Sequence, residues 1–263
     1  MKVERLKKSE LVDYCKSVGI DTDKKDKNTL MEEAQEYRLN QIRQAVENGV
    51  AGELLKAEIE SLAEAYSINL RRKIDDRKEE MKEDDISHYL IYRVLGISSA
   101  EGQLIDEYQN TGRFLYKYAG SFLEEAASLC FEFNNPGRGK RMVENNQGLR
   151  PKTFEIDFLD GNNAIEIKWR DATTDGDHIT KEHTRVKCIQ SHGFKPIRAM
   201  FYYPQRAQAK KIQETLKTIY AGVGGEYYAG DEAWDFVSKY SGYDLKSILT
   251  EIAERRIPEN GKE

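Results

Sequence analysis

The segment Thr153–Arg170 constrains the fold more than any other part of the chain. Two runs of alternating apolar residues flank a turn-forming Asp-Gly-Asn-Asn sequence, and this pattern predicts a β-hairpin whose strands each have one buried face. A two-residue turn and a four-residue turn centred here give the same register. In that register Asp157 lies opposite Glu166, and Glu155 lies opposite Lys168.

The polar face of this hairpin carries the candidate site, because Glu155, Asp157, Glu166 and Lys168 are expected to share it while the apolar side chains pack on the core. Two opposed carboxylates about 5 Å apart repel by roughly 3 kcal/mol at an effective dielectric of about 20. A divalent cation such as Mg²⁺ reverses the sign of this energy, since it binds carboxylate and phosphate oxygens. Lys168 would then orient or deprotonate a water molecule beside the metal. The alternative is a solvated edge whose charges only prevent aggregation.

Asp157, followed after eight residues by Glu166-Ile167-Lys168, resembles the catalytic motif of the PD-(D/E)XK nucleases, although Ile156 stands where that motif has proline. The hairpin and the long segment after it resemble a type II restriction endonuclease, and residues 167–178 are most similar to ApaLI-like enzymes.

The resemblance implies an α/β fold of the restriction-endonuclease type, with a mixed β-sheet core flanked by helices. It implies Mg²⁺ held by Asp157, Glu166 and the backbone carbonyl of Ile167, with Lys168 as the third catalytic residue. It further implies 5′-phosphate and 3′-hydroxyl products and a homodimer that reads a palindromic site in double-stranded DNA. In this family a helix before the hairpin often contributes a further acid to the metal site. Glu124 or Glu125, on a helix expected at residues 120–133, fits that position, and ordinary surface glutamates are the alternative.

Basic charge surrounds the hairpin although the whole chain has a net charge of −5. Residues 134–211 hold 15 Lys and Arg against 9 Asp and Glu, so this segment carries +6 and the remainder −11. Phosphate binding depends on such a local patch. We expect phosphate contacts from a loop at residues 134–152, and base recognition after the hairpin, where polar and basic side chains suit major-groove edges. The candidates are Arg138, Lys140 and Arg141 in the first segment, and Arg170, Asp171, Thr173, Thr174 and Asp175 in the second. Further DNA-contact candidates are His178, Lys181 and Arg185, which follow this second segment.

The pattern along the chain predicts a helical N-terminal region over residues 1–95, which serves as a dimerisation or DNA-contacting arm, and a nuclease core over residues 96–263. Ser98 and Glu101 have capping-box spacing and should begin a helix that runs to about residue 118. A strand over residues 197–203 and a helix over residues 205–220 complete a mixed sheet. The glycine-rich residues 222–230 are expected to form a connecting turn.

Composition is consistent with one sizeable core, since 39% of the 263 residues are hydrophobic. No apolar run has the roughly 18 residues of a membrane span, and the first seven residues lack a signal-peptide core, so we expect a soluble cytoplasmic protein. Cys15, Cys130 and Cys188 have neither disulfide-framework nor zinc-site spacing. No nucleotide-binding loop is present, so no nucleotide cofactor is expected.

The sequence thus predicts a Mg²⁺-dependent, site-specific deoxyribonuclease. A DNA repair or junction-resolving nuclease remains an alternative within the enzyme class. A non-catalytic DNA-binding protein remains an alternative outside it.

Overall fold

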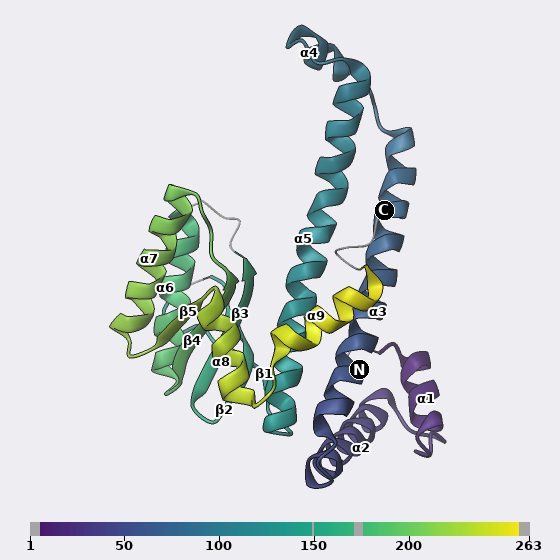
Figure 1. The fold of residues 1–263 in the computed structure, drawn as a ribbon, viewed down its shortest axis with the longest axis vertical. Coiled ribbons are helices and arrows are strands. Elements are labelled where there is room, and N and C mark those ends of the chain that lie inside the picture. Colours follow the sequence, from purple (N-terminus) through teal and green to yellow (C-terminus); the bar gives the residue numbers. More distant parts are fainter. Residues whose placement is uncertain (1–5, 149, 171–175, 258–263) are drawn as a thin grey trace.

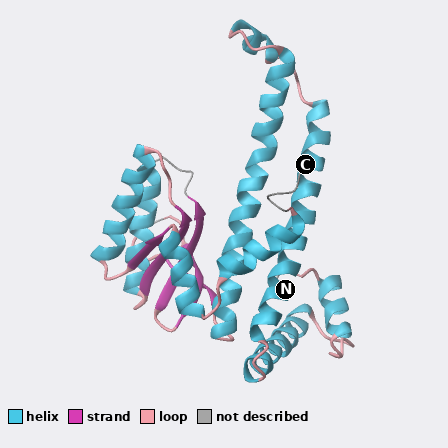
Figure 2. Ribbon diagram, in the orientation of Figure 1, coloured by secondary structure: helices cyan, strands magenta, loops and turns pink. Residues whose placement is uncertain are grey.

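The computed structural model describes residues 6–148, 150–170 and 176–257. This part of the chain forms an α/β protein with a five-stranded mixed sheet and a largely helical N-terminal region, which confirms the predicted fold class (Figure 1; Figure 2). The elements run α1 (Lys8–Ser17), α2 (Lys27–Glu47), α3 (Ala51–Glu80), the 3-10 turn η2 (Met81–Glu83), α4 (Tyr89–Val94), α5 (Ser99–Asn134), β1 (Gly139–Glu144), β2 (Thr153–Asp160), β3 (Asn163–Arg170), α6 (Gly176–Ser191), β4 (Lys195–Tyr202), α7 (Ala207–Gly222), β5 (Glu226–Ala229), α8 (Asp231–Ser241) and α9 (Leu245–Arg256).

The strands lie in the order β1-β2-β3-β4-β5. The pairs β1–β2 and β2–β3 are antiparallel, and the pairs β3–β4 and β4–β5 are parallel. A two-residue turn joins β2 to β3, with Gly161 at a φ of 55° that favours glycine. Phe158 pairs with Ile165 and Asp160 with Asn163, so the register predicted next to the turn is confirmed.

Helices cover both faces of the sheet, with α5 and α8 on one side and α6 and α7 on the other (Figure 1). The larger core lies on the α5 face and contains Phe158, Ile165 and Ile167 together with residues of α3, α5, α8 and α9. A smaller core on the α6 face contains Phe154 and Ile156. The strands of the hairpin are therefore buried on both faces, and the expected solvent-facing side of the hairpin is wrong.

A β-bulge in β2 explains why Ile156 and Phe158 belong to different cores. Gly139 of β1 pairs with Leu159, whereas Arg141 pairs with Ile156, so that Asp157 and Phe158 together lie opposite a single residue of β1. Such a bulge interrupts the alternation of side chains and changes the direction in which a side chain points. The prediction of strict alternation fails at this point because an extra residue is inserted in the strand, which residue types do not reveal.

Three further boundaries differ from the sequence-based prediction. The expected loop at residues 134–152 contains β1, which is held by backbone pairing to β2 rather than by an apolar pattern. The expected turn at residues 222–230 contains the short strand β5. The two helices expected on either side of residue 119 are one helix, α5, which passes through Gly120. Its predicted start is confirmed, since the Ser98 side chain accepts a hydrogen bond from the Glu101 N–H at 3.2 Å.

The helices α3 and α5 run side by side away from the sheet and form an arm with α4 at its far end (Figure 1). The body of the molecule buries α3 as far as Ile59 and α5 from Leu123 onward. All residues between Ile59 and Leu123 are described, and among them only Gly102 is buried. Within the described residues, no helix is both long enough and apolar enough to cross a membrane.

Candidate active site

The structure brings Asp157, Glu166 and Lys168 together at the end of the hairpin away from its turn. The Lys168 Nζ lies 3.8 Å from Asp157 Oδ2 and is also ion-paired with Glu166. Asp157 and Glu166 are buried, with 5% and 3% of their surfaces exposed, whereas the Lys168 side chain is 34% exposed. Lys168 is therefore the most exposed of the three side chains.

The carboxylates approach Lys168 from opposite faces of the sheet. Asp157 lies in the bulge and close to Glu124 of α5. Glu166 lies on the α6 face, where it is ion-paired with Arg185. Sequence reasoning placed both carboxylates on one face because it assumed unbroken alternation in β2.

The two acids differ in protonation. Burial and the nearby Glu166 charge raise the pKa of Asp157 to about 7. Burial also raises the pKa of Glu166, but Lys168 and Arg185 outweigh it and hold that pKa well below its usual range. Burial lowers the pKa of Lys168, and the two carboxylates more than reverse this, so Lys168 is held in its charged form. Two buried acids with opposite pKa shifts next to a half-buried lysine are typical of a functional site.

A second group of acids adjoins Asp157. Oxygen atoms of Glu124, Glu155 and Asp157 all lie within 4.8 Å of one another. Lys140 bridges two of them, with its Nζ 2.6 Å from Glu124 and 2.7 Å from Glu155. Lys140, which was expected to contact phosphate, therefore neutralises carboxylates in this structure. Its location on β1, opposite the bulge, gave no signal in the sequence because β1 was expected to be a loop.

Comparison with known families decides what kind of protein contains this arrangement. The sequence model of the ApaLI-like restriction endonucleases matches residues 27–254. The chain belongs to the ApaLI-like restriction endonuclease family. No curated protein and no solved structure matches the chain. Membership of this family makes the protein a restriction endonuclease with DNA as its substrate, and the match includes both the helical arm and the sheet.

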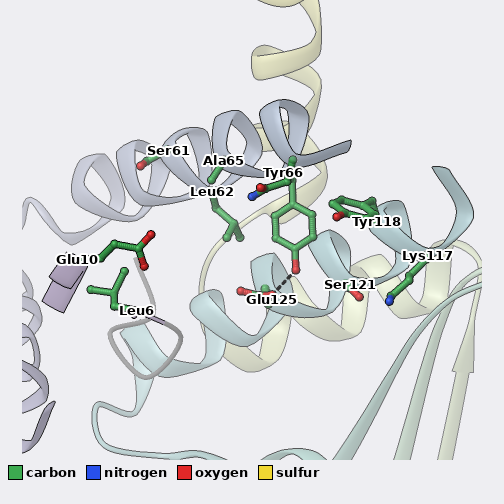
Figure 3. A pocket seen from close by; sticks show the side chains of 11 residues that line it. Leu6, Glu10, Ser61, Leu62, Ala65, Tyr66, Lys117, Tyr118, Ser121 and Glu125 are labelled. Atoms are coloured by element: carbon green, nitrogen blue, oxygen red, sulfur yellow. Dashed lines mark hydrogen bonds between the residues drawn. The ribbon is translucent and has the colours of Figure 1, made fainter. Parts of the chain in front are cut away.

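Of the two candidate acids on α5, only Glu124 approaches the hairpin carboxylates in this ApaLI-like endonuclease. Glu125 is 2% exposed and accepts a hydrogen bond from the Tyr66 hydroxyl of α3. Figure 3 shows this bond at the wall of a cavity of about 520 Å³, which α1, α3 and α5 line. Adjacent residues of a helix point about 100° apart, so one glutamate faces the sheet and the other faces the arm.

Apart from Lys140, the predicted DNA-contact residues fall into three groups. Arg138, Arg141, Arg170 and Lys181 are exposed. Arg170 lies over two aromatic rings, with its Cζ 5.2 Å from the centroid of Tyr116 and 5.5 Å from that of Trp169. Arg185 is mostly buried, with 19% of its side chain exposed, and its partner is Glu166. Asp171, Thr173, Thr174 and Asp175 lie outside the described residues, as does the side chain of His178.

A buried polar network of Arg198, Glu182 and Tyr220 lies next to Glu166, and the sequence analysis did not predict it. Arg198 of β4 lies next to Glu166 in the register of the two strands, and its Nη1 lies 3.1 Å from Glu182 Oε1. The Tyr220 hydroxyl donates a hydrogen bond of 2.6 Å to the same oxygen. Glu182 and Arg185 are three residues apart on α6, so they share one face of that helix. This spacing was a usable signal, but the sequence analysis considered Arg185 only as a DNA contact.

Proposed function

We propose that this chain is a type II restriction endonuclease that hydrolyses both strands of double-stranded DNA at a specific palindromic site. The reaction uses Mg²⁺ and leaves 5′-phosphate and 3′-hydroxyl ends. The enzyme works as a homodimer in the cytoplasm, within a restriction-modification system. The observation that carries the proposal is the joint contact of Lys168 with Asp157 and Glu166 in a chain of a restriction endonuclease family.

The residues present fit a hard divalent cation. Among the described residues, oxygen atoms of Glu124, Glu155 and Asp157 lie within 4.8 Å of one another, with neither a thiolate nor an imidazole in the group, and Lys168 joins Asp157 to Glu166. Mg²⁺ and similar ions prefer such oxygen ligands. Asp157, Glu166 and the Ile167 carbonyl would hold the ion, and Glu124 would support it or its water ligands. When bound, the metal stabilises charge on the phosphate and lowers the pKa of a coordinated water.

The chain's own residues then have separate roles. Lys168 is protonated while it contacts both acids, so in this state it donates hydrogen bonds and orients water or a phosphate oxygen. Glu166 is ionised at neutral pH because Lys168 and Arg185 surround it. Asp157 has to lose its proton to act as a ligand, and its raised pKa makes acidic conditions unfavourable for the reaction.

Specificity is assigned to the segment after β3. Arg170 is the last residue of the strand that carries Glu166 and Lys168, and residues 171–177 follow it in the sequence. Arginine recognises guanine bidentately, and Asp and Thr side chains meet other base edges. Arg138, Arg141 and Lys181 are exposed cations that would contact the phosphate backbone.

Incubation of the purified protein with a long plasmid and Mg²⁺ tests the proposal. Discrete fragments at fixed positions support a site-specific endonuclease. A mobility shift without cleavage indicates a non-catalytic DNA-binding protein, and cleavage confined to branched or damaged DNA indicates a repair or junction-resolving nuclease. Asp157→Asn is the matched negative control, because it changes one oxygen to nitrogen and removes the carboxylate charge.

A further inference from the structure

The arm exposes an unusual number of large apolar side chains. Five belong to α4 and its flanks, namely Ile86, Leu90, Ile91, Val94 and Leu95, and their exposed fractions range from 59 to 74%. Five more lie on the first half of α5 and are 47 to 70% exposed. We call these ten residues the arm surface.

The α5 part of the arm surface is one continuous stripe. Leu104, Ile105, Tyr108, Leu115 and Tyr116 recur at spacings of three, four and seven residues, which places them on one side of a helix. The neighbouring side of α5 faces α3, where Lys78 pairs with Glu107 and Arg77 donates to Asn110. The contacts between α3 and α5 thus include polar pairs as well as the packing of Tyr66 on Tyr118 and Phe122. The stripe residues stay 47 to 70% exposed in the described chain, although Tyr116 at the base of the stripe packs on Trp169.

A glycine lies in the middle of the stripe, where packing within the described chain does not require one. Gly112 follows Tyr108 by four residues and precedes Tyr116 by four, and a Cβ placed on it meets nothing within 4 Å. Glycine inside a helix costs about 1 kcal/mol relative to alanine. A position of this kind is expected where another backbone approaches closely.

The area and chemistry of the arm surface indicate what kind of partner covers it. At roughly 60 to 120 Å² of apolar area per Leu or Ile side chain, ten side chains exposed by about one half to three quarters present roughly 500 Å². A standard interface buries about 800 Å² on each partner, of which roughly 60% is apolar. The stripe contains no charged residue, so it does not repel a second copy of itself and offers no cation to phosphate.

We infer that the arm surface is the homodimer interface, with the α5 stripe of one copy packed against the same stripe of a second copy and Gly112 near the crossing point. This inference rests on the proposed function, in which each chain supplies one active site and a palindrome requires two. It moves the interface from the N-terminal helices in general to α4 and α5. The base of the stripe adjoins the catalytic hairpin, because the rings of Tyr116 and Trp169 lie 5.6 Å apart.

Sedimentation equilibrium over a concentration series, without DNA or Mg²⁺, tests the interface separately from catalysis. The wild-type chain should reach twice its 30.3 kDa mass. The double variant Leu104→Glu with Leu115→Glu should dissociate at concentrations about a hundredfold higher or more, since a symmetric interface receives each substitution twice. Val46→Glu, in α2, is the control because Val46 is exposed to a similar extent at 48%, against 52% for Leu104 and 53% for Leu115.

Circular dichroism should show that all variants keep the wild-type helix content, because the substituted side chains are exposed. Gly112→Ala provides a second, independent test of the interface. It favours the helix within one chain, but in a close crossing it should weaken dimerisation about tenfold, whereas Gly120→Ala, which also meets nothing within 4 Å, should not. Each of three results would overturn the inference. The wild type could be monomeric, Val46→Glu could abolish a dimer that the arm variants keep, or the arm variants could stay dimeric, even if they no longer bind DNA.

Discussion

The Asp157 carboxylate takes a position that a strand carbonyl normally has, because its Oδ2 accepts a hydrogen bond of 2.8 Å from the Ile167 N–H. The bond ties the acid of β2 to the strand that carries Glu166 and Lys168. The relative positions of Asp157, Glu166 and Lys168 are therefore fixed by the backbone of one hairpin. Sites held in this way need little reorganisation when substrate binds.

Asp157→Asn should abolish cleavage and raise the stability of the metal-free protein at neutral pH. The pKa of Asp157 is about 7 in the folded protein against an ordinary 3.8, so the folded state holds this proton more tightly than the unfolded state. The aspartate therefore costs no stability below about pH 4, and its cost grows as the pH rises to about 7. Urea unfolding should show a gain between about 1 and 4 kcal/mol at pH 8 that vanishes near pH 4. An equal gain at both values would contradict the assignment.

Glu166→Gln should also abolish cleavage, but its effect on stability should have the opposite sign. Lys168 and Arg185 stabilise the ionised Glu166, and the substitution leaves two cations facing a neutral amide. Removal of one partner from a buried ion pair costs about 3 kcal/mol or more. Parallel urea titrations of both variants at pH 8 measure the contrast. If Asp157→Asn or Glu166→Gln still cleaved DNA at saturating Mg²⁺, the substituted residue would not be a metal ligand.

Lys168→Ala should slow cleavage by orders of magnitude and change the affinity for the specific site only modestly, because the ammonium group serves the reacting atoms. Lys168→Arg keeps the charge but has a planar, longer head group, so it should recover stability more than rate. Single-turnover cleavage and binding measured in Ca²⁺ separate these effects. A Lys168→Ala variant that cleaves at the wild-type rate would rule out the proposed role.

Glu124→Gln and Glu125→Gln form a matched pair of neighbouring substitutions with different expected readouts. Glu124→Gln should raise the Mg²⁺ concentration needed for half-maximal cleavage, because Glu124 lies within 4.8 Å of Asp157. Glu125→Gln should leave that concentration unchanged and lower the melting temperature, because it alters the buried contact with Tyr66. Metal titrations and thermal unfolding of both variants check the assignment. Reversed outcomes would make Glu125 the metal-site residue.

The basic residues before β2 should differ in their contribution to DNA binding. Neutralising Arg138 and Arg141, which are exposed, should flatten the dependence of log affinity on log salt by about 0.9 for each phosphate that the variant no longer neutralises. Lys140→Gln should change this slope less, because Lys140 is already paired with Glu124 and Glu155. Fluorescence anisotropy with duplex DNA over a salt series measures the slopes. An unchanged slope in the double variant would mean that this segment does not touch the backbone.

Arg170→Ala should reduce discrimination between the cognate site and its single-base neighbours by about 1 to 3 kcal/mol at one position of the site. Its nonspecific affinity should change far less. The measurement is cleavage of the cognate duplex and of every single-base variant. Lys181→Ala is the control, since removal of a phosphate-binding cation weakens binding to all sequences alike. Discrimination ratios equal to those of the wild type would place recognition elsewhere.

The hairpin was the most predictable part of the protein because its turn and its two strands are encoded locally. Residue types at consecutive positions were enough to predict the turn, the register next to it and the location of Asp157, Glu166 and Lys168. The start of α5 was predicted for the same reason, since the Ser98 cap is a contact within one turn of helix.

The environment of the hairpin was not predictable because it depends on contacts between distant segments. The bulge is defined only by pairing with β1, and β1 has no apolar alternation that identifies it as a strand. The burial of both hairpin faces follows from α5 and α6 packing on opposite sides, and this changes Arg185 from an expected DNA contact into a partner of Glu166. The choice between Glu124 and Glu125 needed the orientation of α5, which a pattern of two adjacent glutamates does not supply.

The bulge at Asp157 and Phe158 makes the geometry of the proposed site depend on the number of residues in β2 as well as on their identity. A deletion of Phe158 keeps every acid and the lysine in the sequence, but it removes the extra residue that separates the two faces of the strand. The same motif letters would then describe a hairpin in which Asp157 takes the place of Phe158 opposite Ile165, one residue away from its present position next to Glu166 and the Ile167 N–H. Among homologues, a gap at this position is therefore a stronger sign of abolished activity than most substitutions beside it.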